Sequence, residues 1–184
     1  MVVGLGNPGQ QYEKTRHNAG FWFLDGLAAE KNAYWNDEGR FQGMLAPVRI
    51  EGETVYFLKP QTFMNCSGQA VGKIVRYYKI NPQEILVAHD ELDFEAGIIK
   101  FKRGGGHGGH NGLRDIISHL GSGEFCRVRI GVGHPGDRRK VTNYVLSEPS
   151  KTEKENIAVK IESVLSDVDV LVKGDLDELT TRWH

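Results

Sequence analysis

The chain is predicted to fold as an α/β sandwich in which a single domain spans residues 1–184. Stretches with the two-residue apolar period of strands alternate along the sequence with stretches that have the period of helices. No internal repeat, low-complexity tract or proline- and serine-rich linker separates them, so one domain is the simplest organisation. Two successive strand patterns flank Glu51-Gly52-Glu53, which predicts a hairpin and therefore a mixed sheet.

The predicted strands are short runs of apolar or alternating residues. In chain order they are residues 1–5, 41–50, 54–59, 84–89, 98–102 and 127–132. Residues 85–88 form the unbroken apolar run Ile-Leu-Val-Ala, which is typical of a central strand. Residues 127–132 alternate basic and apolar side chains, which predicts a half-exposed strand.

The predicted helices each carry an apolar stripe at the spacing of an α-helix. They comprise residues 20–31, 67–78, 111–119 and 152–172. Ser67 is expected to cap the second helix, and Pro82 ends that segment. In the last helix the apolar stripe continues from Ile157 to Val172, so we expect one long helix there.

Composition indicates a globular protein. Hydrophobic residues make up 39% of the chain and charged residues 26%, a balance that disfavours disorder. Cys66 and Cys126 are too few for a disulfide scaffold and form no Cys-x-x-Cys pair, so reduced thiols are expected. No basic, apolar leader follows Met1, and no apolar run reaches the roughly 18 residues of a membrane span. We therefore expect a cytoplasmic protein with no membrane contact.

The net charge of −1 hides an uneven distribution. Between residues 98 and 140 lie only three acidic side chains, but nine basic ones: Lys100, Lys102, Arg103, Arg114, Arg127, Arg129, Arg138, Arg139 and Lys140. Such a stretch is either a solvated surface or a local site for a polyanion. Taken alone, the pattern favours neither.

The glycine-rich start matches a dinucleotide-binding pattern, but its context does not. Residues 4–9, Gly-Leu-Gly-Asn-Pro-Gly, fit G-x-G-x-x-G. In dinucleotide sites a helix begins within the glycine turn and holds the pyrophosphate. Here Pro8 and the polar run after it predict a loop, and helical periodicity starts only near Gly20. We therefore expect no dinucleotide cofactor.

Four polar clusters lie at the ends of predicted strands or helices. They are residues 15–20 around His17, residues 60–65, residues 89–93 and the glycine-rich residues 104–112. Because sites in open α/β sheets gather just beyond strand ends, these clusters are expected to converge. Each also has a structural explanation: Asp90 could bind turn amides, Asn65 could belong to a turn, and Asn111 could cap a helix.

The side chains in these clusters favour activation of water. The chain has no G-x-S-x-G nucleophile motif, so the available chemistry lies in histidine, aspartate and asparagine. His17 would act as a base near neutral pH, and Asp90 would orient its ring. Asparagine side chains would position the water or stabilise an oxyanion.

A metal-dependent hydrolase is the competing interpretation of the same region. His107 and His110 are three residues apart, and His89-Asp90 could complete a set of ligands. Ligands at this spacing usually need a helix, whereas Gly108-Gly109 predicts a flexible loop. We therefore expect no metal.

Six motifs stand out as an ordered set. They are Gly-Leu-Gly-Asn-Pro-Gly (4–9), Tyr-Glu-Lys-Thr-Arg-His-Asn-Ala-Gly (12–20), Thr-Phe-Met-Asn-Cys-Ser-Gly (62–68), His-Asp-Glu-Leu-Asp (89–93), the glycine loop (104–112) and Arg-Ile-Gly-Val-Gly-His-Pro-Gly (129–136). With these motifs the chain resembles the bacterial peptidyl-tRNA hydrolases over about residues 2–146. The N-terminus looks a few residues shorter than is usual in that family, which bears on the first strand. The C-terminus also looks short, which bears on tRNA affinity more than on chemistry.

The resemblance implies a monomeric α/β enzyme without metal or cofactor. Its twisted, mixed and mostly parallel sheet would lie between helices in a three-layer sandwich. The implied reaction is hydrolysis of the ester between a peptide and the 3′ ribose of tRNA, which recycles tRNA from prematurely released peptidyl-tRNA. A tRNA- or RNA-binding module without catalysis is the alternative, but it leaves the histidine, aspartate and asparagine clusters unexplained.

The resemblance also implies roles for individual residues. His17 and Asp90 match the family's catalytic histidine and its carboxylate partner. The asparagines that match its site are Asn7, Asn65 and Asn111, and the residues that match its peptide and 3′-end crevice are Tyr12, Met64 and His110. Lys102 matches a residue associated with tRNA phosphate, with Arg129, or else Arg127, as its partner.

Overall fold

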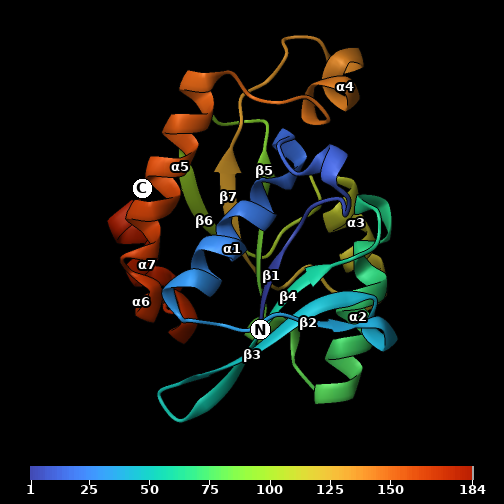
Figure 1. Cartoon of the computed structure of the whole chain (residues 1–184), viewed down its shortest axis with the longest axis vertical. Coiled ribbons are helices and arrows are strands. Elements are labelled where there is room, and N and C mark those ends of the chain that lie inside the picture. The colour runs from blue at the N-terminus through green and yellow to red at the C-terminus, as the bar shows by residue number, and fades with distance from the viewer. Residues whose placement is uncertain (184) are drawn as a thin grey trace.

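A computed structural model describes residues 1–183, which form one seven-stranded sheet covered by helices (Figure 1). The strand order is β2-β3-β4-β1-β5-β7-β6. The strands are β1 (Val2–Gly4), β2 (Asn36–Glu38), β3 (Gly43–Ile50), β4 (Glu53–Pro60), β5 (Leu86–Glu91), β6 (Ile99–Arg103) and β7 (Cys126–Gly131). Strands β4, β1, β5 and β7 are parallel neighbours, whereas β3 and β6 pair antiparallel to β4 and β7. The predicted mixed, mostly parallel sheet is confirmed.

Helices cover both faces of this sheet. They are α1 (Ala19–Glu30), α2 (Ser67–Tyr78), α3 (Asn111–Leu120), α4 (Val141–Val145), α5 (Lys151–Leu165), α6 (Val168–Lys173) and α7 (Leu176–Trp183). Figure 1 shows α5, α6 and α7 on the left, α2 and α3 on the right, and α4 beyond the ends of β5 and β7. Within the described part of the chain, no helix is both long enough and apolar enough to cross a membrane.

The sheet separates two apolar cores. Successive residues of a strand point to opposite faces, and Val2 and Val3 of β1 accordingly belong to different cores. One core includes Leu27 of α1 and Ile161 of α5, and the other includes Ile74 of α2. This arrangement is the expected three-layer sandwich.

Glycines let α1 pack directly onto the ends of β1 and β5. A Cβ atom at Gly20 would lie 2.3 Å from the carbonyl oxygen of Ala88, and one at Gly4 would lie 2.4 Å from the carbonyl oxygen of Gly20. Only glycine allows so close an approach of backbone to backbone. Gly4 of the glycine-rich start therefore has a packing role, which brings the beginning of α1 onto β5.

Two expectations about single elements are wrong. β7 is not half-exposed but lies between β5 and β6, and Arg129 is the only one of its six residues that is not buried. Its second basic residue, Arg127, is buried because its guanidinium donates to backbone carbonyls of the glycine loop. Ser67 opens α2 but does not cap it, because its hydroxyl donates to the Met64 carbonyl.

The helix predicted over residues 152–172 is two helices. α5 ends at Leu165 and α6 begins at Val168. At the break, the Asp167 carboxylate accepts hydrogen bonds from Arg182 and Trp183 of α7. Both helices contribute to the same core, so the apolar stripe continues across the break and does not reveal it.

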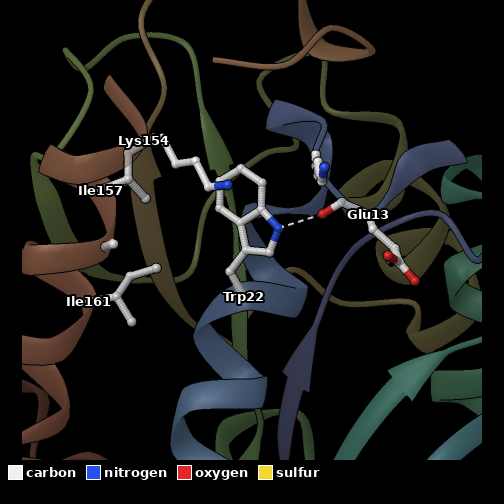
Figure 2. Close-up of a pocket in the computed structure, with 7 residues that line it drawn as sticks. Glu13, Trp22, Lys154, Ile157 and Ile161 are labelled. Carbon is white, nitrogen blue, oxygen red and sulfur yellow. Dashed lines mark hydrogen bonds between the residues drawn. The ribbon is translucent and has the colours of Figure 1, made fainter. Parts of the chain in front are cut away.

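A hollow of about 280 Å³ lies between α5 and the loop that precedes the 3₁₀ helix η2 (Arg16–Asn18), as Figure 2 shows. It is lined by Glu13, Lys14, Trp22, Lys154, Ile157, Ala158 and Ile161. The Trp22 indole donates a hydrogen bond to the Glu13 carbonyl at 2.8 Å. The loop and α5 are therefore not joined by close packing at this place.

Candidate active site

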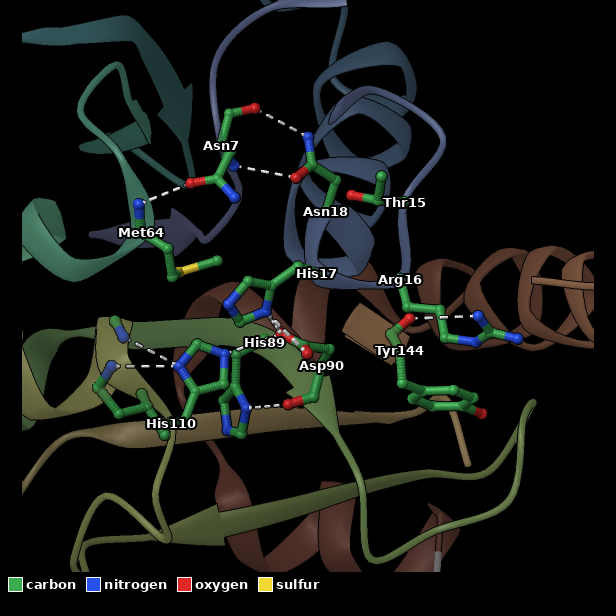
Figure 3. Close-up of polar contacts among 12 residues, drawn as sticks. Asn7, Thr15, Arg16, His17, Asn18, Met64, His89, Asp90, His110 and Tyr144 are labelled. Carbon is green, nitrogen blue, oxygen red and sulfur yellow. Dashed lines mark hydrogen bonds and ion pairs between the residues drawn. The ribbon is translucent and has the colours of Figure 1, made fainter. Parts of the chain in front are cut away.

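Polar side chains from several segments meet beyond the carboxyl ends of the central parallel strands (Figure 3). Asn7 follows β1, Met64 follows β4, and Asp90 lies in the last part of β5. His17 lies in η2, and His110 directly precedes α3. The structure thus brings together one residue from each of the four clusters and, with them, Asn7 from the glycine-rich start.

Asp90 joins two histidines through its carboxylate. His17 Nδ1 lies 2.9 Å from both carboxylate oxygens, and His110 Nε2 lies 2.8 Å from Oδ1. His110 Nδ1 accepts from the backbone N–H groups of Gly112 and Leu113, so the ring proton of His110 lies on Nε2. Because an ionised carboxylate only accepts, neutral His17 donates from Nδ1 and keeps a lone pair on Nε2.

Burial and charge act against each other in this pair. Burial would raise the pKa of Asp90, but His17 and His110 hold that pKa well below its usual range. Burial lowers the pKa of His17, but the charge and the hydrogen bond of Asp90 together outweigh burial, so the pKa lies above its ordinary value of 6.5. A carboxylate that stays ionised therefore strengthens His17 as a base.

His89 adds a third imidazole to the cluster, with its ring centre 5.1 Å from that of His110. His89 Nδ1 donates to the backbone carbonyl of Asp90 at 2.8 Å, and His89 Nε2 is buried without a partner among the described residues. Burial, helped by the nearby His110, lowers the pKa of His89 to about 3. His89 is therefore neutral at neutral pH.

Asn7 is held through its backbone and its side chain. Its N–H donates to Asn18 Oδ1 at 2.9 Å, and Asn18 Nδ2 donates to the Asn7 carbonyl at 3.0 Å. The Met64 N–H donates to Asn7 Oδ1 at 2.7 Å, so the remaining donor of the Asn7 amide is Nδ2. Asn18 was not singled out from the sequence, although it lies in the same motif as His17, and the structure shows it buried.

The other two asparagines predicted for the site, Asn65 and Asn111, line a separate polar hollow of about 380 Å³ beside α3. Both Asn65 and Asn111 are exposed. His110, rather than Asn111, caps α3 by accepting two backbone hydrogen bonds. Tyr12 packs edge-on against the exposed Phe63, with ring centres 6.2 Å apart. Nothing about the position of Phe63 in the sequence indicated that it would contact Tyr12.

The three basic side chains expected at tRNA phosphates differ in their exposure and in the partners that they already bind. Lys102 is exposed at the end of β6. Arg129 uses its Nε to bind Glu91 at 2.9 Å and is partly exposed. Arg127, the alternative to Arg129, is 4% exposed, and its guanidinium donates to two carbonyls of the glycine loop. Lys102 and Arg129 are therefore the two that remain available to a ligand.

Within residues 1–183, one group of three potential metal ligands is close enough to share an ion. Its members are His17, Asp90 and His110, whose ligand atoms lie within 4.8 Å of one another. His107 is not a member, and its Nδ1 accepts from the Gly109 N–H. Two of the three ligand atoms are ring nitrogens whose protons point at Asp90, so a cation would have to replace both protons. The donor set fits a proton-transfer network better than a metal centre.

This chain is similar, in sequence and in structure, to proteins whose family is known. The chain matches the family model described as peptidyl-tRNA hydrolase over residues 1–184. It is 50% identical to the peptidyl-tRNA hydrolase of Delftia acidovorans and 52% identical to that of Coxiella burnetii, over the whole of this chain and over 89% and 96% of those proteins. The crystal structure of peptidyl-tRNA hydrolase from Acinetobacter baumannii superposes with a TM-score of 0.94 at 46% identity, covering 98% of this chain and 91% of that one. The chain belongs to the peptidyl-tRNA hydrolase family.

Proposed function

We propose that the chain hydrolyses the ester between a peptide and the 3′ ribose of tRNA through general-base catalysis by His17. Hydrolysis of peptidyl-tRNA is the activity for which its family is named. The observation that carries the assignment to His17 is the contact of its Nδ1 with both oxygens of the buried Asp90, at 2.9 Å. This contact favours the tautomer whose Nε2 can accept a proton.

In the proposed mechanism, His17 Nε2 removes a proton from water, and the water oxygen attacks the ester carbonyl carbon. The Asp90 carboxylate stabilises the imidazolium that forms. The carbonyl oxygen becomes negative, and Asn7 Nδ2 donates a hydrogen bond to it. The bond between the carbonyl carbon and the ribose oxygen then breaks, and the ribose oxygen takes the proton from His17.

The remaining site residues are assigned to the substrate. The residues proposed to shape the crevice for the peptide and the 3′ end are Tyr12, Met64 and His110. Asn65 and Asn111 are proposed, with Asn7, to position the ester carbonyl and to share its developing charge. Lys102 and Arg129 are proposed to bind tRNA phosphate, which gives affinity and register rather than sequence specificity. The exposure of Lys102 on β6 and the partial exposure of Arg129 on the neighbouring β7 support this assignment.

We further propose that residues 1–184 act as one domain, as a monomer, in the cytoplasm. The single sheet shared by all the described strands supports the assignment of one domain. Peptidyl-tRNA is the proposed partner, and no dinucleotide takes part.

The test is hydrolysis of N-blocked aminoacyl-tRNA, compared with the matching free aminoacyl-tRNA, in the presence of EDTA. We expect release of the blocked amino acid and little release of the free one. Binding of tRNA without release from either substrate would favour an RNA-binding module. Activity that returns only with added zinc would favour a metal-dependent hydrolase.

A further inference from the structure

The 3₁₀ helix η2 directs three successive side chains to three different parts of the fold (Figure 3). Such a helix has about three residues per turn, so neighbouring side chains diverge widely. Arg16 binds residues of α4 and α5, and His17 binds Asp90 on β5. Asn18 binds the backbone of Asn7. The orientation of His17 therefore depends on the anchors on either side of it.

Arg16 is the anchor on the side of α4 and α5. It is 7% exposed, and its guanidinium donates to Ser147 Oγ at 2.6 Å and to Glu153 Oε2 at 2.9 Å. It also donates to the Tyr144 carbonyl at 3.3 Å and lies 3.9 Å from the centre of the Tyr144 ring. The backbone N–H of Arg16 donates to the Ser147 carbonyl at 3.0 Å. A forked guanidinium held in this way has an orientation that an ammonium group cannot reproduce.

The groups that receive Arg16 are themselves fixed. Glu153 Oε2 also accepts from the Ser150 N–H at 2.7 Å, as part of the capping box of α5. The Tyr144 hydroxyl donates to the Val132 carbonyl at 2.7 Å, just beyond β7. The three residues that bind the Arg16 guanidinium, Tyr144, Ser147 and Glu153, form a socket. This socket is connected to the sheet through Tyr144 and to α5 through Glu153.

Apolar packing contributes little to the same connection. The hollow in Figure 2 lies between Glu13 and Lys14 of the loop and Ile157 of α5. Trp22 of α1 holds the loop through its hydrogen bond to the Glu13 carbonyl, but this contact does not reach α5. The polar link between η2 and α5 is therefore the contact of Arg16 with Glu153.

We propose that Arg16 is a positioning residue for hydrolysis, because its contacts with α4 and α5 hold His17 in line with Asp90. The proposal rests on the proposed role of His17 as the base. In Figure 3 Arg16 points away from Asp90, so it acts through the backbone of η2 rather than on the substrate. Misplacement of a reacting group by about 1 Å can cost roughly a hundredfold in rate. A looser η2 is therefore expected to lower kcat and to leave substrate affinity unchanged.

The variant Arg16→Lys keeps the charge and removes the fork. Its control is Arg182→Lys, because Arg182 is likewise an arginine in ion pairs, with the carboxylates of Asp167 and Glu178, but near the C-terminal end of the chain. We expect kcat of Arg16→Lys to fall about tenfold, both with N-blocked aminoacyl-tRNA and with a short N-blocked aminoacyl-nucleotide, while KM stays within about twofold. The control should keep the kcat of the wild type. A rise in KM confined to full-length tRNA would mean that Arg16 contacts the tRNA and would overturn the proposal.

A second variant, Glu153→Gln, loosens the socket without changing η2 and decides the matter if Arg16→Lys does not fold. It removes the charge but keeps an oxygen for the Ser150 N–H. We expect a smaller fall in kcat, together with weakening of the proton NMR signal of the His17 Nδ1–H bond to Asp90. Unchanged kcat and an unchanged signal in folded variants would overturn the proposal. An active His17→Ala variant would instead refute the proposed function.

Discussion

Replacing Asp90 with asparagine keeps the shape of the side chain but removes its charge and turns one acceptor into a donor. Oδ1 of Asp90 accepts from both His17 and His110, whereas Oδ2 accepts only from His17. His110 cannot change its tautomer, because its Nδ1 already accepts two backbone hydrogen bonds. The amide oxygen must therefore take the place of Oδ1, and the amide NH₂ group must face His17. That contact favours the His17 tautomer with its proton on Nε2, which cannot accept a proton from water.

The size of the effect follows from this change of tautomer. In a Ser-His-Asp triad the same substitution lowers kcat about 10⁴-fold for the same reason. The shared contact of His17 with Oδ1 would preserve part of the productive tautomer, so we expect a loss of about 10³–10⁴-fold, or about 4–5 kcal/mol of transition-state stabilisation. Asp90 also raises the pKa of His17. Removing Asp90 therefore lowers that pKa, and the rise of kcat/KM with pH should move to lower pH.

The assay is steady-state hydrolysis of N-blocked aminoacyl-tRNA over roughly pH 5 to 9, a range that spans the titration of histidine. Asp169→Asn is the control, because Asp169 is an exposed carboxylate that binds Lys31 at 2.8 Å. The control should behave as the wild type. A loss of less than about tenfold in Asp90→Asn, or a profile displaced to higher pH, would refute the reasoning about the tautomer.

Three further results are expected. Asn7→Asp keeps the acceptor for the Met64 N–H but replaces the Nδ2 donor with a charged oxygen, so the single-turnover rate constant should fall about a hundredfold. An unchanged rate constant would refute the hydrogen bond proposed between Asn7 and the ester carbonyl. Lys102→Ala and Arg129→Ala should raise KM for full-length tRNA substrates and spare a short aminoacyl-nucleotide; equal effects on both would argue against phosphate contacts. The pKa of His89 is lowered from 6.5 to about 3 by burial, so between these values the unfolded chain binds a proton that the folded chain does not. In urea titrations, acid should therefore lower the unfolding free energy of the wild type more steeply than that of His89→Gln, by up to about 1.4 kcal/mol per pH unit; parallel curves would contradict a neutral buried His89.

The convergence of His17 and Asp90 could be predicted from sequence, because both lie in polar motifs at the ends of predicted elements, where sites in open α/β sheets gather. The predicted contact between His17 and Asp90 is confirmed at 2.9 Å. The packing behind it could not be predicted, because it depends on how closely Gly20 lets α1 approach β5. The double role of His110 was also hidden. Helix caps are usually serine, threonine, aspartate or asparagine, so Asn111 was the natural candidate for the cap of α3.

The errors in the fold arise where contacts between distant segments outweigh local patterns. Arg127 made β7 look exposed, but a buried arginine is acceptable where loop carbonyls receive its protons. The break after Leu165 was hidden because α5 and α6 pack on the same core and continue the same apolar stripe. The role of Arg16 was hidden for a similar reason, since its partners lie about 130 residues further along the chain.

Single-turnover hydrolysis by His17→Ala tests the central claim most directly, because it measures the chemical step with all the substrate bound. His134→Ala is the matched control, since His134 is an exposed histidine in the loop after β7 and its Nδ1 accepts from the Gly136 N–H. We expect His17→Ala to lose at least about a hundredfold in rate while it stays folded and binds tRNA as the wild type does, with the control close to the wild type. Hydrolysis of N-blocked aminoacyl-tRNA by a folded His17→Ala variant at nearly the wild-type rate would contradict the assignment of His17 as the general base.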